Sequence, residues 1–185
     1  SSFRTILLHG FLFLMPLFVK AQEALPYDLN KPTEILTLPK YLEEISGLSY
    51  YHEDALAMLN DEHGDMYIYD LKQKKVIDKI PFKGKGDFEG IERVRDQVFA
   101  VKSNGTLYKF QVGKEGVVEK IKTPFEHAND IEGLAYDPFN DLLLFALKGS
   151  GDVGAFDVKG KGIYAYDLST ALFIEEPTAV VLNKE

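Results

Sequence analysis

Short apolar runs alternate with polar turns along most of this chain. Three aliphatic runs are each followed by a polar turn and then by a segment in which aromatic residues alternate with other residues. The aliphatic runs are residues 55–59, 97–101 and 142–147, and the alternating segments are residues 66–71, 106–110 and 162–168. Runs of four to eight residues that are rich in Tyr, Phe, Val and Ile and bounded by Gly, Asn and Asp are typical of strands. No window outside the extreme N-terminus has a sustained helical period, so the pattern predicts an all-β protein.

A five-residue motif precedes each aliphatic run. It combines an acidic residue, an apolar residue, Ser or Glu, a glycine and an aliphatic residue, and its copies begin at Glu44, Asp87 and Asp130, 43 residues apart each time. A more polar segment closes the first two units, at residues 75–80 and 118–121. Four strands in a repeat of about 40–50 residues are typical of one blade of a β-propeller. The sequence therefore predicts a β-propeller with four-stranded blades, of which about three are present.

Three blades are fewer than a closed propeller needs, since propellers have about 4–8. We expect five or six blades in the complete protein, so the chain is interpreted as truncated at its C-terminus, with two blade faces exposed that later blades would cover. The segment Thr33–Leu38 predicts a lone strand that would complete the last blade of the ring.

The N-terminus has a different character from the rest of the chain. Arg4 precedes a short apolar stretch that ends at Val19, and Val19-Lys20-Ala21 offers small residues for cleavage. This pattern predicts a signal peptide over residues 1–21 and a propeller domain over residues 22–185. A membrane anchor is the alternative interpretation, although the apolar stretch is shorter than the ~20 residues of a membrane span.

Charge and cysteine content narrow the function classes. Loss of Arg4 and Lys20 with the signal peptide would change the formal net charge from −8 to −10. An acidic surface repels phosphate backbones, which argues against nucleic-acid binding. The chain has no cysteine, so disulfides and thiolate metal sites are excluded.

The acidic residues of the motif are the candidate functional residues. Because the first two strands of a blade are antiparallel, the start of the first strand and the end of the second lie at the same face. This should bring together the carboxylates of Glu44, Asp61, Glu62, Asp87, Glu89, Asp130 and Glu132. Residues two apart, such as Asp87 and Glu89, should point to the same side of a strand.

Such a cluster needs a cation, a basic partner or raised pKa values. Calcium fits well, because it takes 6–8 oxygen ligands from carboxylates and carbonyls. Zinc fits poorly, with no Cys and scattered His residues. The alternative is internal pairing. Lys102 and Lys148 are aligned with each other and with Asn60, at the ends of their strands, and would neutralise the carboxylates of the second and third motifs.

The motif copies and the turn at residues 60–64, Asn-Asp-Glu-His-Gly, resemble the SdiA-regulated (YjiK-like) family. The similarity spans about residues 27–168. It implies an exported bacterial β-propeller, distantly similar to NHL-repeat propellers, with a calcium site and no established catalytic activity. Periplasmic or secreted localisation, association with the cell membrane and a scaffolding role are also suggested by the resemblance.

Two functions remain open at this point. The first is an extracytoplasmic calcium-binding propeller that acts as a binding or scaffold module, with a protein or a small ligand on the propeller face. The second is a metal-dependent hydrolase, similar to lactonase, esterase or phytase propellers, in which Asp87, Glu89 and Glu132 would supply the metal ligands and the base.

Overall fold

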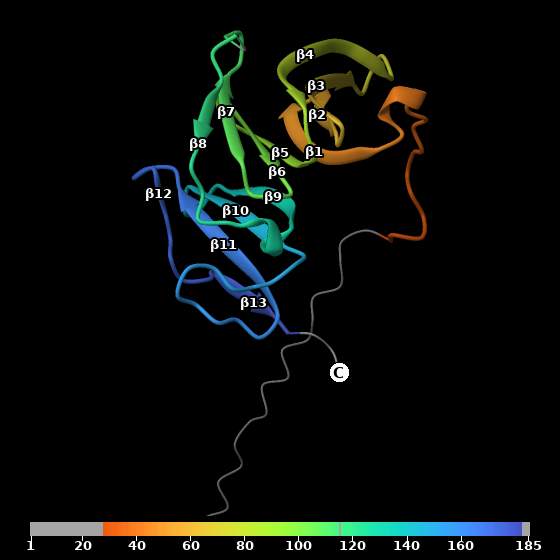
Figure 1. Cartoon of the computed structure of the whole chain (residues 1–185). Coiled ribbons are helices and arrows are strands. Elements are labelled where there is room, and N and C mark those ends of the chain that lie inside the picture. Colours follow the sequence, from red (N-terminus) through yellow and green to blue (C-terminus); the bar gives the residue numbers. More distant parts are fainter. Residues whose placement is uncertain (1–27, 115, 183–185) are drawn as a thin grey trace, which may run out of the picture. The chain divides into compact units, whose positions relative to one another are not determined.

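A computed structural model describes residues 28–114 and 116–182 of the chain (Figure 1). The chain divides into two units, residues 1–35 and residues 36–185. In the described part of the first unit, the backbone of Asn30 donates a hydrogen bond to the Asp28 carboxylate. The predicted signal peptide, residues 1–21, lies outside the described residues. Among residues 28–114 and 116–182, no helix is both long and apolar enough to cross a membrane.

The second unit contains three antiparallel sheets, each formed by consecutive strands (Figure 1). The first sheet comprises β1 (Ile45–His52), β2 (Ala55–Asn60), β3 (His63–Asp70) and β4 (Lys75–Lys85). The second comprises β5 (Phe88–Val94), β6 (Gln97–Lys102), β7 (Leu107–Gln111) and β8 (Glu119–Ile121). The third comprises β9 (Ile131–Asp137), β10 (Leu142–Leu147), β11 (Lys161–Asp167), β12 (Leu172–Phe173) and β13 (Ala179–Val181). Two 3-10 turns, η1 (Lys40–Leu42) and η2 (His127–Asn129), precede the first and third sheets.

These sheets confirm the prediction of three four-stranded propeller blades, which we call blades 1, 2 and 3. In blade 3 the position of the fourth strand is divided. β12 pairs with one end of β11, through Tyr166 and Asp167, and β13 pairs with the other end, through Lys161 to Ile163. The first strand of each blade is the inner strand, since β1 contacts β5 and β5 contacts β9.

The core lies between successive blades. Between blades 1 and 2, Phe88, Ile91 and Phe110 are fully buried in one apolar cluster, where each contributes about 1.5–3 kcal/mol. A second cluster between blades 2 and 3 contains Phe145 and Tyr164. Alternate side chains of a strand therefore face different neighbouring blades and contribute to different apolar clusters.

The lone strand at Thr33–Leu38 stays a prediction, since its expected partner lies beyond the described blades. These residues form no ladder in the described part of the chain. A strand needs a neighbour for its backbone groups, and the expected neighbour was a blade beyond the three described. Leu36 and Leu38 instead pack beside the buried Leu42 on the outer face of blade 1.

Each inner strand begins with a β-bulge at the third motif position. The register shifts between Ile45 and Gly47, and again between Phe88 and Gly90. In blade 3 the corresponding shift skips Glu132. Bulges re-aim side chains at sheet rims. The bulge takes Glu89 out of the regular ladder, yet its side chain still meets that of Asp87, as the spacing of two residues predicts.

Candidate functional site: the acidic group at the blade rim

The residue that follows the second strand lies beside the first motif residue in every blade. The backbone N–H groups of Asp61, Ser103 and Lys148 donate to the carbonyls of Glu44, Asp87 and Asp130, respectively. The next blade is attached at the same turn, since Phe88 donates its N–H to the Asp61 carbonyl and Ile131 donates to Ser103. Asp61, Ser103 and Lys148 are therefore structurally equivalent.

The three equivalent side chains have different chemistry. Ser103 Oγ donates to the Asp87 carboxylate. Lys148 Nζ lies 2.6 Å from Glu132 Oε1 and 3.7 Å from Asp130 Oδ2, and these contacts raise the pKa of Lys148. Asp61 offers no donor to Glu44, and its Oδ1 is buried with no hydrogen-bond partner. Blade 1 thus carries an uncompensated carboxylate where the other blades carry a donor.

Glu89 lies near this carboxylate and has a raised pKa. Burial raises the pKa of Glu89 from 4.5 to about 7, and repulsion from Glu132, Asp87 and Asp61 adds to the rise. A hydrogen bond with the Asp87 carboxyl favours the protonated form further. We call Asp61, Asp87, Glu89 and Glu132 the acidic group. Near neutral pH it needs either a proton or a cation.

The prediction of internal pairing is correct for one lysine of the two. Lys148 pairs as expected, but Lys102 forms no ion pair with Asp87 or Glu89 in the described structure. Its Nζ lies 4.9 Å from the centre of the Phe88 ring and 3.4 Å from the Lys85 carbonyl. The strand pairing explains the difference. Lys102 is paired with Phe88 in the ladder, just as Asn60 is paired with Ile45. In blade 3 the residue at that place is Leu147, which is paired with Ile131, so Lys148 comes one residue later.

Not all seven predicted residues lie in one place. Glu44 and Glu62 line a polar cavity of about 430 Å³ on blade 1, together with Lys40 and His63. Asp130 lies on the Lys148 side of Glu132, at the end of η2. The charges of Asp61, Asp87 and Glu132 act on Glu89, whereas Glu44 and Glu62 line the blade 1 cavity and Asp130 shares Lys148 with Glu132.

Comparison with known proteins identifies the family. The profile of the SdiA-regulated family matches residues 27–154, which is more than half of the chain and includes all three motif copies. The chain belongs to the SdiA-regulated family. No curated protein sequence matches the chain.

Similar solved structures support the propeller fold of this SdiA-regulated protein. They include hydrazine synthase from Kuenenia stuttgartiensis, with 13% identity and a TM-score of 0.51, over 74% of this chain and 37% of that chain. The WD40 domain of Pan2 from Neurospora crassa has 12% identity and a TM-score of 0.52, over 77% and 42%. The computationally designed Ika4 protein has 12% identity and a TM-score of 0.50, over 82% of each chain. The chain thus spans less than half of the two natural proteins.

The donor set of the acidic group suits a hard cation such as calcium, since every candidate ligand is a carboxylate oxygen. The unpartnered Asp61 Oδ1 and the raised pKa of Glu89 both fit such a cation. As the side chains are placed, however, no three His, Asp or Glu side chains of the described residues form a group that could hold a metal ion. Calcium binding by this SdiA-regulated protein therefore stays a prediction, and it requires side-chain rotation or carbonyl ligands.

Sequence reasoning missed two features of the site. Ser103 is one, because differing turn lengths hide its equivalence to Asp61. The other is a polar contact between blades 1 and 2, where Ser49 Oγ donates to Glu92 Oε1 at 3.0 Å and accepts from the backbone N–H of Arg93. Burial raises the pKa of Glu92. Ser49 and Glu92 are 43 residues apart, so the repeat period itself marks them as equivalent positions.

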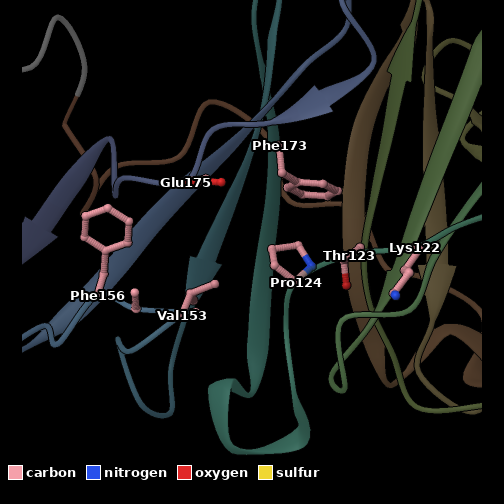
Figure 2. Close-up of a pocket in the computed structure, with 9 residues that line it drawn as sticks. Lys122, Thr123, Pro124, Val153, Phe156, Phe173 and Glu175 are labelled. Carbon is pink, nitrogen blue, oxygen red and sulfur yellow. The ribbon is translucent and has the colours of Figure 1, made fainter.

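A separate, mostly apolar cavity of about 490 Å³ lies on blade 3. Figure 2 shows Val153, Phe156, Phe173 and Pro124 around it. The cavity shares no residue with the acidic group or with the polar cavity of blade 1. It is therefore a separate concave surface on this SdiA-regulated protein.

Proposed function

We propose that this protein is an exported propeller that binds a hard divalent cation, best matched by calcium, at the acidic group, and that acts as a binding or scaffold module. The single observation that carries the proposal is the buried Asp61 Oδ1, which has no partner and stands beside carboxylates that raise the pKa of Glu89 to about 7. A bound cation would satisfy that oxygen and remove the repulsion.

The residues that would hold the cation follow from the electrostatics. Asp61 Oδ1 has no partner, and Asp87 and Glu89 have only neutral ones, namely the Ser103 hydroxyl and the hydrogen bond between the two carboxyl groups. Glu132 already has Lys148 as its partner, so we expect it to contribute less to cation binding than Asp61, Asp87 and Glu89. When bound, calcium would supply positive charge and would fix the turn after β2 to the start of β5. Stabilisation of the contact between blades 1 and 2 is the expected effect.

Calcium titration of the purified protein tests this proposal. We expect isothermal titration to detect binding and the melting temperature (Tm) to rise by several degrees. Saturation at about 100 times Kd adds about 2.7 kcal/mol, and 1 kcal/mol moves the Tm of a domain of this size by about 2–4 °C. Asp61→Asn and Glu89→Gln should abolish both signals.

The matched control for these variants is Asp157→Asn. It removes the same charge from an exposed position in the loop between β10 and β11, so it should leave calcium binding unchanged. Absence of a Tm shift and of binding heat at millimolar calcium would contradict the proposal. The acidic group would then be neutralised by protonation of Glu89 alone.

One observation favours a hydrolase as the second candidate function. A carboxyl with a pKa of about 7 has the acidity of a general acid or base that operates at neutral pH. Glu89 would then be the base, and its neighbouring carboxylates would be metal ligands. Lactone and phosphoester substrates, assayed with calcium, test this alternative. Turnover by the wild type that Glu89→Gln lacks, with calcium binding retained in that same variant, would favour catalysis by Glu89 over calcium binding alone.

Export rests on the predicted signal peptide over residues 1–21. Fractionation of bacterial cells that express the whole chain should place the protein in the periplasm or the medium, with its N-terminus at position 22. An intact N-terminus in the membrane fraction would instead favour the membrane anchor.

A further inference from the structure

The apolar cavity of blade 3 lies on the side of that blade that faces blade 2 (Figure 2). Its walls are residues 122–124, which follow β8 of blade 2, and residues 153–156, 173 and 175 of blade 3. The Phe173 ring contacts the rings of Phe125 and Phe145, at centre-to-centre distances of 5.7 and 5.5 Å. Phe145 belongs to the core between blades 2 and 3. The cavity is therefore formed by two adjacent blades.

A second cavity, of about 370 Å³, adjoins the apolar cavity. The two share Pro124, Val153 and Gly154 as lining residues. The second cavity is polar, because its other lining residues are Glu126, Ala128, Asn129, Ser150 and Asp152. We call it the loop cavity, since the β10–β11 loop forms one of its walls.

Buried hydrogen bonds hold the walls of the loop cavity in place. Asn129 is 3% exposed, and its Nδ2 donates to the backbone carbonyls of Ser150 and Asp152 at 3.0 and 2.7 Å. Its Oδ1 accepts from the backbone N–H of Glu126 at 2.7 Å. These bonds join η2 to the β10–β11 loop in the protein alone. A ligand would therefore not have to order these two segments, which lowers the cost of binding.

Charge distinguishes the two cavities. Among the described residues, Glu126 and Asp152 place two carboxylates on the loop cavity, and no lysine, arginine or histidine lines it. Asp152 Oδ1 accepts only from a neutral donor, the backbone N–H of Val158 at 2.7 Å. The described lining of the apolar cavity has one cation, Lys122, and one carboxylate, Glu175, so its charges balance. The pair of cavities therefore has an apolar, balanced end and a polar, negative end.

We propose that the two cavities together bind one amphiphilic small molecule with a cationic head group. Its apolar body would occupy the apolar cavity, against Val153, Phe156 and Phe173, and its ammonium group would lie at the carboxylates of Glu126 and Asp152. The apolar cavity, at about 490 Å³, is within the range of about 300–1,000 Å³ of small-molecule sites. The site shares no residue with the acidic group, so it is independent of calcium binding.

Isothermal titration of the 185-residue chain with three alkyl ligands, below their micelle concentrations, tests the proposal. Decyltrimethylammonium should bind saturably with one molecule per chain. The octyl homologue should bind up to about 15-fold more weakly, because two fewer methylenes enter the apolar cavity. Decanoate, which has a carboxylate head group, should bind at least about 5-fold more weakly than the decyl ammonium ligand, because Glu126 and Asp152 repel it.

Two sets of variants separate this site from adsorption of a cationic ligand to the acidic surface. Ala155→Trp fills part of the apolar cavity and should weaken binding at least about 10-fold. Lys159→Trp is its control, since Lys159 is exposed in the same loop and lines neither cavity. The double variant Glu126→Gln and Asp152→Asn keeps the acceptor oxygens and removes both charges, so it should lose the preference for the ammonium ligand. Asp157→Asn, in the same loop and outside both cavities, should keep that preference.

Circular dichroism checks that each variant folds, and the double variant still tests the charge preference if Ala155→Trp does not fold. Three results would overturn the proposal. The first is the absence of saturable binding of the decyl ammonium ligand. The second is binding that Ala155→Trp weakens no more than Lys159→Trp does, which would indicate adsorption elsewhere on the surface. The third is decanoate binding as tight as that of the ammonium ligand, which would show that the carboxylates do not select the head group.

Discussion

The same five-residue motif begins β5 and β9, yet the two strands differ in their surroundings. Glu89 in blade 2 stands among carboxylates and has a pKa of about 7, whereas Glu132 in blade 3 is paired with Lys148 at 2.6 Å. Gly90 is covered by Leu134 of the next blade, and Gly133 meets only its own sheet within the described residues. The comparison teaches that the motif fixes the backbone, while the turn residue and the neighbouring blade decide what each copy can do.

The largest difference should appear when a methyl group is added to each glycine. Gly90→Ala puts a Cβ 2.7 Å from Leu134 Cβ, which is part of a buried contact and cannot rotate away. We expect a loss of about 1–3 kcal/mol in the free energy of unfolding. Gly133→Ala has 3.1 Å to Ala146 and open space beyond, so the entropy gain of about 0.4–1 kcal/mol should roughly cancel any cost. Urea denaturation at low protein concentration measures both.

Equal losses for the two alanine variants would contradict this difference between the blades. The inter-blade contact at Gly90 would then be less tight than the distances indicate. A loss of stability confined to Gly133→Ala would mean that Gly133 is covered even in dilute solution.

The local pattern of the sequence was sufficient for the fold. Strands such as β2 and β10 are apolar runs bounded by turns, and the 43-residue spacing sets the blades in series, so no long-range information was needed. The lone strand at 33–38 stays a prediction, because pairing requires a partner elsewhere in space. The prediction that Lys102 and Lys148 occupy equivalent positions was wrong, because the turns before them differ in length. A shift of one residue in a strand moves a side chain to the opposite face.

The site was only partly predictable for the same reason. Carboxylates at the strand starts follow from the motif, but the pairing of Ser103 with Asp87 and the isolation of Asp61 depend on hydrogen bonds between strand ends. The bulge at Glu89 also interrupts the regular ladder, which the motif alone does not indicate. Charges near each other were predicted, and of their individual partners only Lys148 was.

The next largest effect should come from pH. Because the pKa of Glu89 in the folded state, about 7, exceeds its ordinary value of 4.5, the folded protein holds a proton more tightly than the unfolded chain. The associated stability is fully present below about pH 4.5 and is lost as pH rises through 7. Discounted for the solvent access of Glu89, we expect a loss of about 1 kcal/mol, or about 2–4 °C in Tm, between pH 5 and pH 8 without calcium.

The difference between wild type and Glu89→Gln isolates this residue, since the raised pKa of Glu92 also contributes to the wild-type profile. Glu89→Gln should be flatter and more stable at pH 8. Glu132→Gln is the blade 3 counterpart and should flatten the profile less than Glu89→Gln, because burial, the main cause of the raised pKa of Glu89, remains when the repulsion from Glu132 is removed. A wild-type Tm that rises from pH 5 to pH 8 relative to Glu89→Gln would refute the assignment.

The smallest effect should come from removing Lys148, the cation that is paired with Asp130 and Glu132. Lys148→Met leaves Asp130 and Glu132 without their partner, but the pair is exposed, so we expect Tm to fall by about 2 °C or less. Glu132 already repels Glu89, and without Lys148 that repulsion should grow, so the pKa of Glu89 should rise further. An NMR titration of the Glu89 carboxyl measures this, with Lys159→Met in the exposed β10–β11 loop as the control. An unchanged Glu89 titration would mean that the two motif copies are electrostatically independent, and the acidic group would then end at blade 2.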